Sequence, residues 1–118
     1  DEIITGSFVN ASAIVSYIQK QNPETVCLVG MGYSTKYPIE EDVACAEYIC
    51  KELEGNSNNF DDMVEHIRKT SGARFFMEEK QHFAPKEDFD LCLNLNRFNF
   101  VLKANRVDNQ LEINKIDI

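Results

Sequence analysis

The sequence lacks the patterns that mark membrane and secreted proteins. No apolar run approaches the roughly 20 residues of a membrane-spanning helix, and no signal-peptide pattern opens the printed chain. The chain also contains no internal repeat and no low-complexity tract. These absences predict a cytoplasmic protein that does not insert into a membrane.

Positive charge is scarce. The chain has 12 lysine and arginine residues against 20 aspartate and glutamate residues, which gives a formal net charge of −8. No local basic patch interrupts this excess of acid, so phosphate backbones and anionic membranes are repelled. We therefore expect neither nucleic acid nor a membrane surface as a partner.

Closely spaced pairs of cysteines are also missing. The cysteines are Cys27, Cys45, Cys50 and Cys92, and none forms a C-x-x-C pair. Only His66 and His82 are available to supplement them, so the usual zinc and redox motifs are not expected. Each cysteine lies in an apolar run, which predicts free, buried thiols in a reducing compartment.

The residues that are present describe one soluble domain. A length of 118 residues, of which 43% are hydrophobic and 27% charged, is enough for a single core. The apolar run 26–29 predicts a strand buried on both faces, and Gly30 and Gly32 end it. Beyond it, apolar residues recur at three- and four-residue steps until Gly55, which predicts an amphipathic helix.

A similar strand, turn and helix open the chain. Ile3 and Ile4 end a short strand, a glycine turn follows, and residues 11–18 present a helical apolar stripe. Two such units in succession are typical of a parallel sheet covered by helices. Further helices are expected to begin at Phe60 and after Pro85.

The end of the chain changes to a two-residue period. Residues 98–115 alternate apolar and polar side chains around a short polar turn, which predicts a β-hairpin. The polar run 78–82 fits either a helix or an irregular excursion. The expected fold is a layered α/β/α domain with a mixed, largely parallel sheet and a C-terminal β-hairpin.

The turn between the first strand and the first helix is one candidate binding site. Gly6, Ser7, Phe8 and Asn10 place backbone amides, a hydroxyl and a carboxamide at a helix start, which suits a phosphate or sulfonate. The alternative is that Ser7 and Asn10 only cap the helix. The sequence leaves both interpretations open.

The second candidate is the glycine loop after residue 29 together with the acids that start the next helix. Gly30 and Gly32 lie close in sequence to Glu41 and Asp42, and carboxylates near the end of a strand can hold magnesium. Acids at a helix start are also favoured by the helix dipole without any metal. No nucleophile can be named, because Ser7 has no base near it in sequence and Cys45 lies on a helix face predicted to be buried.

These segments together resemble a known family. Residues 6–13 resemble the G-S-F-x-N-x-x-A segment of the 2-phosphosulfolactate phosphatases, the ComB family, and residues 41–49 look like its E-D-x-x-C-A-x-x-I segment. Residues 90–101 are similar to the family's C-terminal helix and strand. The three segments occur in the family's order along nearly the whole chain.

The resemblance implies a magnesium-dependent hydrolase that converts 2-phosphosulfolactate to sulfolactate and phosphate, on the route to coenzyme M. It implies that Gly6, Ser7, Phe8 and Asn10, with the glycine loop, hold the small anionic phosphorylated substrate. Glu41 and Asp42 are then the candidates for magnesium. Lys36 is the nearest cation in sequence.

The family's N-terminal segments D-V-L-R-A-[ST]-T-T and T-T-T-N-G-T do not occur in this chain. We therefore expect residues 1–118 to be a single α/β domain, the C-terminal half of a longer phosphatase, inactive alone and partnered by the N-terminal half. The alternative is a non-catalytic anion-binding or regulatory α/β domain. The sequence leaves a homo-oligomer open.

Overall fold

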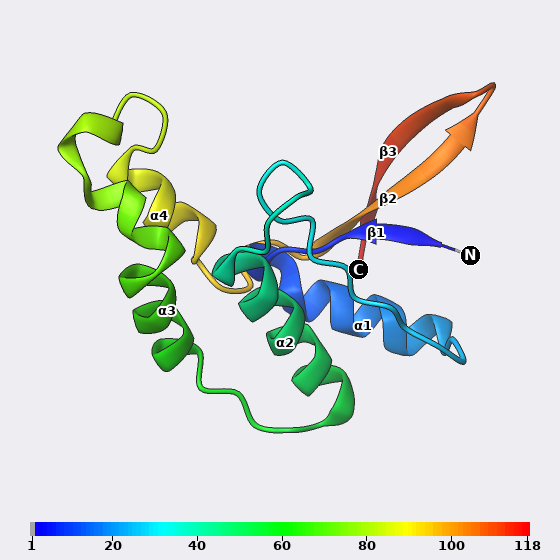
Figure 1. Cartoon of the computed structure of the whole chain (residues 1–118). Helices are drawn as coiled ribbons and strands as arrows, with labels where there is room; N and C mark the ends of the chain where they lie inside the picture. Colours follow the sequence, from blue (N-terminus) through cyan, green and yellow to red (C-terminus); the bar gives the residue numbers. More distant parts are fainter. Residues whose placement is uncertain (1) are drawn as a thin grey trace.

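A computed structural model describes residues 2–118 of the chain as four α-helices, three strands and short 3-10 helices. In chain order the elements are β1 (Ile3–Thr5), η1 (Phe8–Asn10), α1 (Ala11–Gln21), α2 (Glu40–Glu54), α3 (Phe60–Lys69), η2 (Ser71–Phe76), η3 (Glu78–Lys80), α4 (Lys86–Cys92), β2 (Phe100–Val107) and β3 (Gln110–Asp117). Figure 1 shows the strands on one side and α3 and α4 on the other. Within residues 2–118 no helix is both long and apolar enough to cross a bilayer.

The sheet is antiparallel, so the prediction of a largely parallel sheet is wrong. Its order is β1-β2-β3, and both strand pairs are antiparallel. The first strand pairs with β2, far away in sequence, and not with a strand that follows a crossover helix. The mixed α/β character and the C-terminal hairpin are confirmed. Asp108 and Asn109 both have positive φ in its two-residue turn, as a type I′ turn requires.

Residues 26–29, expected to be a buried central strand, have no strand partner among the described residues. They form no regular element, and the side chains of Val26 and Val29 are 41% and 73% exposed. A strand buried on both faces needs neighbouring strands and covering helices. Within residues 2–118 only Leu28 of this segment packs against the core, and no strand pairs with it, so its apolar composition does not become a strand here.

The core lies between α1, α2 and β2 and continues into α3 and α4 through Ile67 and Phe89. Ile14 and Val101 are its largest fully buried side chains. Beside them Phe8, Tyr48 and Phe60 form an aromatic cluster, with ring centroids 5.3–5.9 Å apart in edge-to-face geometry. This cluster joins the first turn of the chain to α2 and α3.

The helices α3 and α4, with η2 between them, form an arm that extends from this core. Gly72 is essential to the arm, because a Cβ there would lie 2.7 Å from both the Ile67 oxygen and the Phe89 ring. Phe89 is buried against Phe75 and Phe76, which closes η2 onto α4. The polar run left open by the sequence becomes the short η3 followed by turns.

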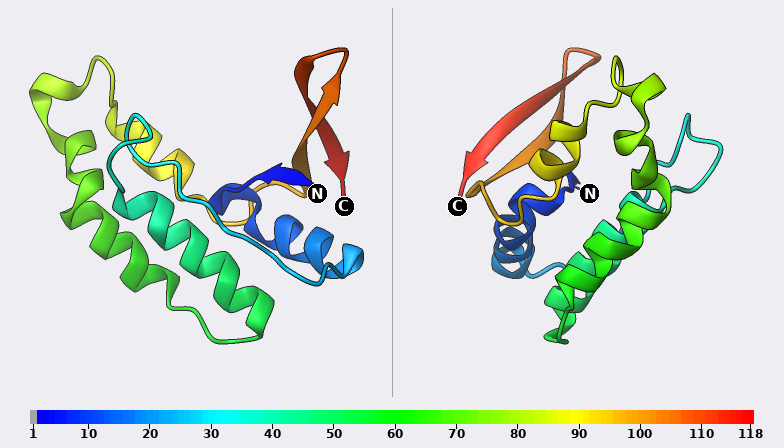
Figure 2. Two further views of the ribbon diagram at one scale, coloured as in Figure 1. Left: turned by 45° about the vertical axis from the view of Figure 1, so that its right-hand side comes forward. Right: turned by 90° about the vertical axis from the view of Figure 1, so that its left-hand side faces the viewer.

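The molecule is extended for its length. Figure 2 shows α2 and α3 side by side, with the β2–β3 hairpin standing away from them. The Cα radius of gyration is 15.3 Å, above the value of about 13.5 Å typical of a domain of this size. Large apolar side chains remain exposed on the hairpin, including Leu111 at 69% and Ile113 at 55%.

Candidate functional site

One pocket of about 200 Å³ brings parts of the two predicted sites together. Gly6, Ser7 and Phe8 line it from the turn after β1, and Glu41 and Asp42 line it from the first turn of α2. These residues lie more than 30 positions apart in sequence. The tertiary structure therefore combines an anion-type turn and a pair of acids in one place.

Asn10 does not line this pocket, although the sequence places it in the anion turn. Its side chain is 5% exposed, and its Nδ2 donates to the Phe100 carbonyl at 2.9 Å, which ties η1 to β2. It makes no capping hydrogen bond to α1. Ser7 does act as a cap, because its Oγ accepts a long 3.4 Å hydrogen bond from the Val9 amide. Ser7 therefore caps η1 and also lines the pocket, whereas Asn10 does neither.

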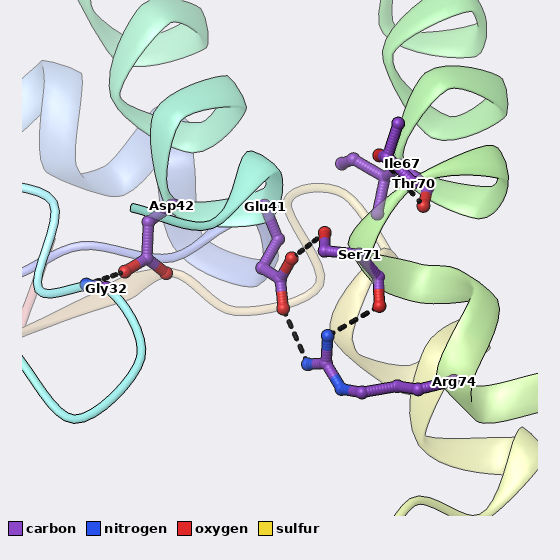
Figure 3. A network of polar contacts seen from close by, with 7 residues as sticks. All are labelled: Gly32, Glu41, Asp42, Ile67, Thr70, Ser71 and Arg74. Atoms are coloured by element: carbon purple, nitrogen blue, oxygen red, sulfur yellow. Dashed lines mark hydrogen bonds and ion pairs between the residues drawn. The ribbon is translucent and has the colours of Figure 1, made fainter. Parts of the chain in front are cut away.

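The glycine loop is fastened to the pocket through Asp42. The Gly32 amide donates to Asp42 Oδ2 at 2.6 Å, and Figure 3 shows this contact at the start of α2. Gly32 has a φ of +67°, and a Cβ there would lie 2.2 Å from the Tyr37 oxygen, so only glycine fits. A Cβ at Gly30 would lie in ordinary contact with the Asp42 Cβ, at 3.5 Å. Gly30 and Gly32 do not themselves line the pocket.

Glu41 points the other way, into a polar network with η2. Its Oε1 accepts from Arg74 Nη2 at 2.6 Å, and its Oε2 accepts from the Ser71 hydroxyl. Arg74 Nη1 also donates to the Ser71 carbonyl at 2.6 Å. Figure 3 shows the two acids diverging, Asp42 toward the glycine loop and Glu41 toward Ser71 and Arg74.

Arg74 lines this pocket, and the sequence analysis did not predict it there. It lines the pocket from η2, and its pair with Glu41 joins residues 33 positions apart. Lys36, the cation expected nearest the site, lies exposed in the loop before α2 and does not line the pocket. The one local signal for Arg74 is its place just after the Ser71-Gly72 break, where a helix ends and the chain turns.

The thiols at the site are poor nucleophiles. Burial, with the nearby Asp42 charge, raises the pKa of Cys45 to about 11, and burial also raises the pKa of Cys92. At neutral pH both stay protonated, and the thiol form does not attack. All four cysteines are free. The prediction that they are buried is wrong for Cys27 and Cys92, which are exposed overall, and Cys45 and Cys50 are only partly buried.

A larger hollow of about 350 Å³ lies on the opposite face of α2. It is lined by Glu40, Val43 and Glu47, with His66 reaching it from α3. His82 lines neither cavity and packs its ring against Phe83, with centroids 4.8 Å apart. Neither histidine therefore reaches the pocket that contains the predicted acids.

The two acids differ in how well they suit a metal ion. No three His, Cys, Asp or Glu side chains in the described part of the chain gather closely enough to hold one. Both Glu41 oxygens already accept hydrogen bonds, one of them from a cation. Asp42 uses only Oδ2, and magnesium commonly takes one or two carboxylates and completes its shell with water and substrate phosphate. Asp42 therefore keeps one carboxylate oxygen that accepts no hydrogen bond in the described part of the chain, whereas Glu41 keeps none.

The Glu41 network predicts a pH-dependent stability. Burial alone would raise the pKa of Glu41, but hydrogen bonds from Ser71 and Arg74 outweigh it and hold the pKa below 4.5. A lowered pKa contributes stability above pH 4.5 that is lost as the pH falls through the folded-state value. We expect Glu41→Gln to cost about 1–2 kcal/mol at pH 7, and the cost to vanish in acid.

Thermal unfolding of both chains between pH 7 and pH 3 checks this expectation. Glu65→Gln is the matched control, because Glu65 makes an exposed pair with Arg68 at 3.4 Å and such pairs contribute little. A cost for Glu41→Gln that is the same at every pH would contradict the network.

Comparison with known proteins covers most of the chain. The family model for 2-phosphosulpholactate phosphatase matches residues 1–106. A probable 2-phosphosulfolactate phosphatase of Trichormus variabilis is 43% identical over 44 residues, which are 37% of this chain and 18% of that protein. The probable 2-phosphosulfolactate phosphatase of Picosynechococcus is 39% identical over 51 residues, 43% of this chain and 21% of that protein.

The matched segments therefore span only about a fifth of each of these relatives. No solved structure matches the chain. The family model nevertheless extends from the turn at Gly6 through the acids of α2 to Arg74 and into β2. On that match the chain belongs to the 2-phosphosulfolactate phosphatase family.

Proposed function

We propose that this chain is the C-terminal half of a cytoplasmic, magnesium-dependent phosphatase that hydrolyses 2-phosphosulfolactate to sulfolactate and phosphate, on the route to coenzyme M. The observation that carries the proposal is the pocket in which Ser7, Asp42 and Arg74 meet. A hydroxyl, a carboxylate and a guanidinium in one small cavity suit a substrate with several anionic groups. The family match supports the reaction.

The charges of the pocket support a metal ion. Glu41, Asp42 and Arg74 together carry one more negative than positive charge, so an anionic substrate is repelled unless a cation joins it. Asp42 is the residue that would hold magnesium, which would supply charge neutralisation at the phosphoryl oxygens. Asp42 also fixes the glycine loop through Gly32, so it sets the shape of the neighbouring backbone.

An N-terminal half is proposed as the intramolecular partner. The segment 26–29 is apolar, exposed and without a strand partner in residues 2–118, and Met31 beside it is 65% exposed. Such a segment is suited to join a sheet supplied by another part of the protein. Further cationic groups for the substrate would come from the same half.

Phosphate release from 2-phosphosulfolactate tests the proposal. It is measured with this chain and with a chain that also carries the family's N-terminal segments, each with magnesium and with a chelator. We expect release by the longer chain alone, and only with magnesium. The absence of release under every condition would contradict the phosphatase.

A non-catalytic anion-binding or regulatory domain is the second candidate. It is favoured because no activated nucleophile is found among the described residues that line the pocket. The Cys45 thiol has a pKa of about 11, and no histidine lies there to act as a base for Ser7. That candidate predicts anion binding by the longer chain without turnover. The same assay, followed by a binding titration, separates the two.

A further inference from the structure

Arg74 has hydrogen-bonding capacity that the protein does not use. A guanidinium carries several N–H donors in a planar fork. In residues 2–118 Arg74 donates one N–H to the Glu41 carboxylate and one N–H to the Ser71 carbonyl, each at 2.6 Å. Its remaining N–H groups have no protein partner in the described part of the chain, and its side chain is 34% exposed beside the pocket.

The guanidinium is also held rigidly in place. It lies over the Phe75 ring, with the guanidinium carbon Cζ 4.6 Å from the ring centroid. Its Nη1 is fixed by the hydrogen bond to the Ser71 carbonyl. An arginine that is already oriented loses little freedom when it binds a ligand. An arginine that served only to join η2 to α2 would not need unused N–H donors facing a pocket.

The charge of the pocket selects the kind of anion. Glu41 stays beside Arg74 and repels an incoming group, so a monoanion is tolerated better than a dianion. A sulfonate is a monoanion with tetrahedral oxygens that match the guanidinium fork, whereas a phosphate monoester carries more charge near neutral pH. The sulfonate is therefore the better match for Arg74. The phosphate is then expected to bind near Asp42.

We propose that Arg74 binds the sulfonate of the substrate and that Glu41 is its counter-ion until the sulfonate arrives, not a magnesium ligand. This inference rests on the proposed function. Arg74 then determines specificity, because it contacts the part of the substrate that does not react. Its loss affects recognition of the sulfonate and leaves the phosphoryl chemistry in place.

Binding of methanesulfonate to the longer chain, followed by calorimetry or by the arginine side-chain NMR signals, is the direct test. We expect Arg74→Gln to weaken binding at least about tenfold, as loss of a charge-assisted hydrogen bond implies. Glu41→Gln removes the competing charge and is expected to tighten binding several-fold. Arg68→Gln is the matched control, because Arg68 pairs with Glu65, stacks on Phe76 and Phe89 and does not line the pocket. It is expected to bind methanesulfonate like the wild type.

Inorganic phosphate is the second probe and Arg74→Lys the second variant. We expect phosphate to bind with less dependence on Arg74 than methanesulfonate shows. The lysine variant keeps the charge without the fork and is expected to bind methanesulfonate at an intermediate strength, and it remains informative if the glutamine variant does not fold. Equal binding by the Arg74→Gln and Arg68→Gln chains, or tighter and Arg74-dependent binding of phosphate, would overturn the assignment.

Turnover of two substrates separates sulfonate binding from a structural role, because a structural defect would lower kcat/KM for both substrates alike. We expect Arg74→Gln to lower kcat/KM for 2-phosphosulfolactate but not for 2-phospholactate, which lacks the sulfonate. An equal loss for both substrates overturns the assignment. If the enzyme hydrolyses neither substrate while methanesulfonate binding still depends on Arg74, the proposed function fails and the anion site stands.

Discussion

Replacing Asp42 with asparagine is expected to lower phosphate release by the complete enzyme about 100-fold or more. A metal ion stabilises the transition state of phosphoryl transfer by several kcal/mol, and each 1.4 kcal/mol is about a tenfold change in rate. Asp42 is the acid in the pocket with an oxygen left for magnesium, since Oδ2 alone accepts from Gly32. Asparagine keeps an oxygen for the Gly32 amide and removes only the charge. The loop should therefore stay in place while magnesium affinity falls.

The measurement is kcat as a function of magnesium concentration. The Asp42→Asn enzyme should need more magnesium for half-maximal rate, whereas an effect on loop structure alone would not depend on magnesium. Glu40→Gln is the matched control, because Glu40 starts the same helix but lines the hollow on its other face. Unchanged kcat and magnesium dependence in Asp42→Asn would contradict the proposal that Asp42 holds magnesium.

Replacing Phe8 with alanine is expected to destabilise the chain by about 3–5 kcal/mol, the range typical of a large aromatic removed from a core. The Phe8 side chain is 5% exposed and packs edge-to-face on both Tyr48 and Phe60. Its removal opens a cavity where the first turn, α2 and α3 meet. Because Phe8 also lines the pocket, anion binding should weaken together with stability.

Urea unfolding of the 118-residue chain checks the Phe8 prediction. Phe83→Ala is a suitable comparison, because Phe83 is 61% exposed and exposed substitutions usually change stability by less than about 0.5 kcal/mol. Phe8→Leu retains most of the apolar volume and is expected to fall between the two. Similar midpoints for Phe8→Ala and Phe83→Ala would show that the aromatic cluster contributes little.

Local periodicity predicts the helices well. The apolar residues at helical spacing indicate α1, α2 and α3, and the structure confirms each of them. Pro85 and the acids after it correctly mark the start of α4. Gly55 ends α2 with a positive φ, as the sequence suggests. The hairpin is predicted for the same reason, because its alternation and its Asp-Asn turn are local signals.

The sheet is where the sequence reasoning fails. An apolar run such as residues 26–29 indicates that a segment favours burial, but it does not indicate which strand or helix buries it. The direction and partner of β1 depend on β2, about 100 residues later, and no local pattern encodes that pairing. Two strand-to-helix units therefore suggest a parallel sheet that residues 2–118 do not form.

The candidate site also has features that the sequence predicts and features that only the tertiary structure decides. Residue types and their order along the chain are enough to indicate the family, the turn at Ser7 and the acids Glu41 and Asp42, because those signals are contained in short segments. The burial of Asn10 follows from the packing of η1 on β2. The placing of Arg74 against Glu41, in the pocket that Ser7 also lines, follows from the packing of η2 on α2. Contacts of this kind join residues that are distant in sequence, so they depend on how helices and turns pack in three dimensions and not on any local preference of the chain.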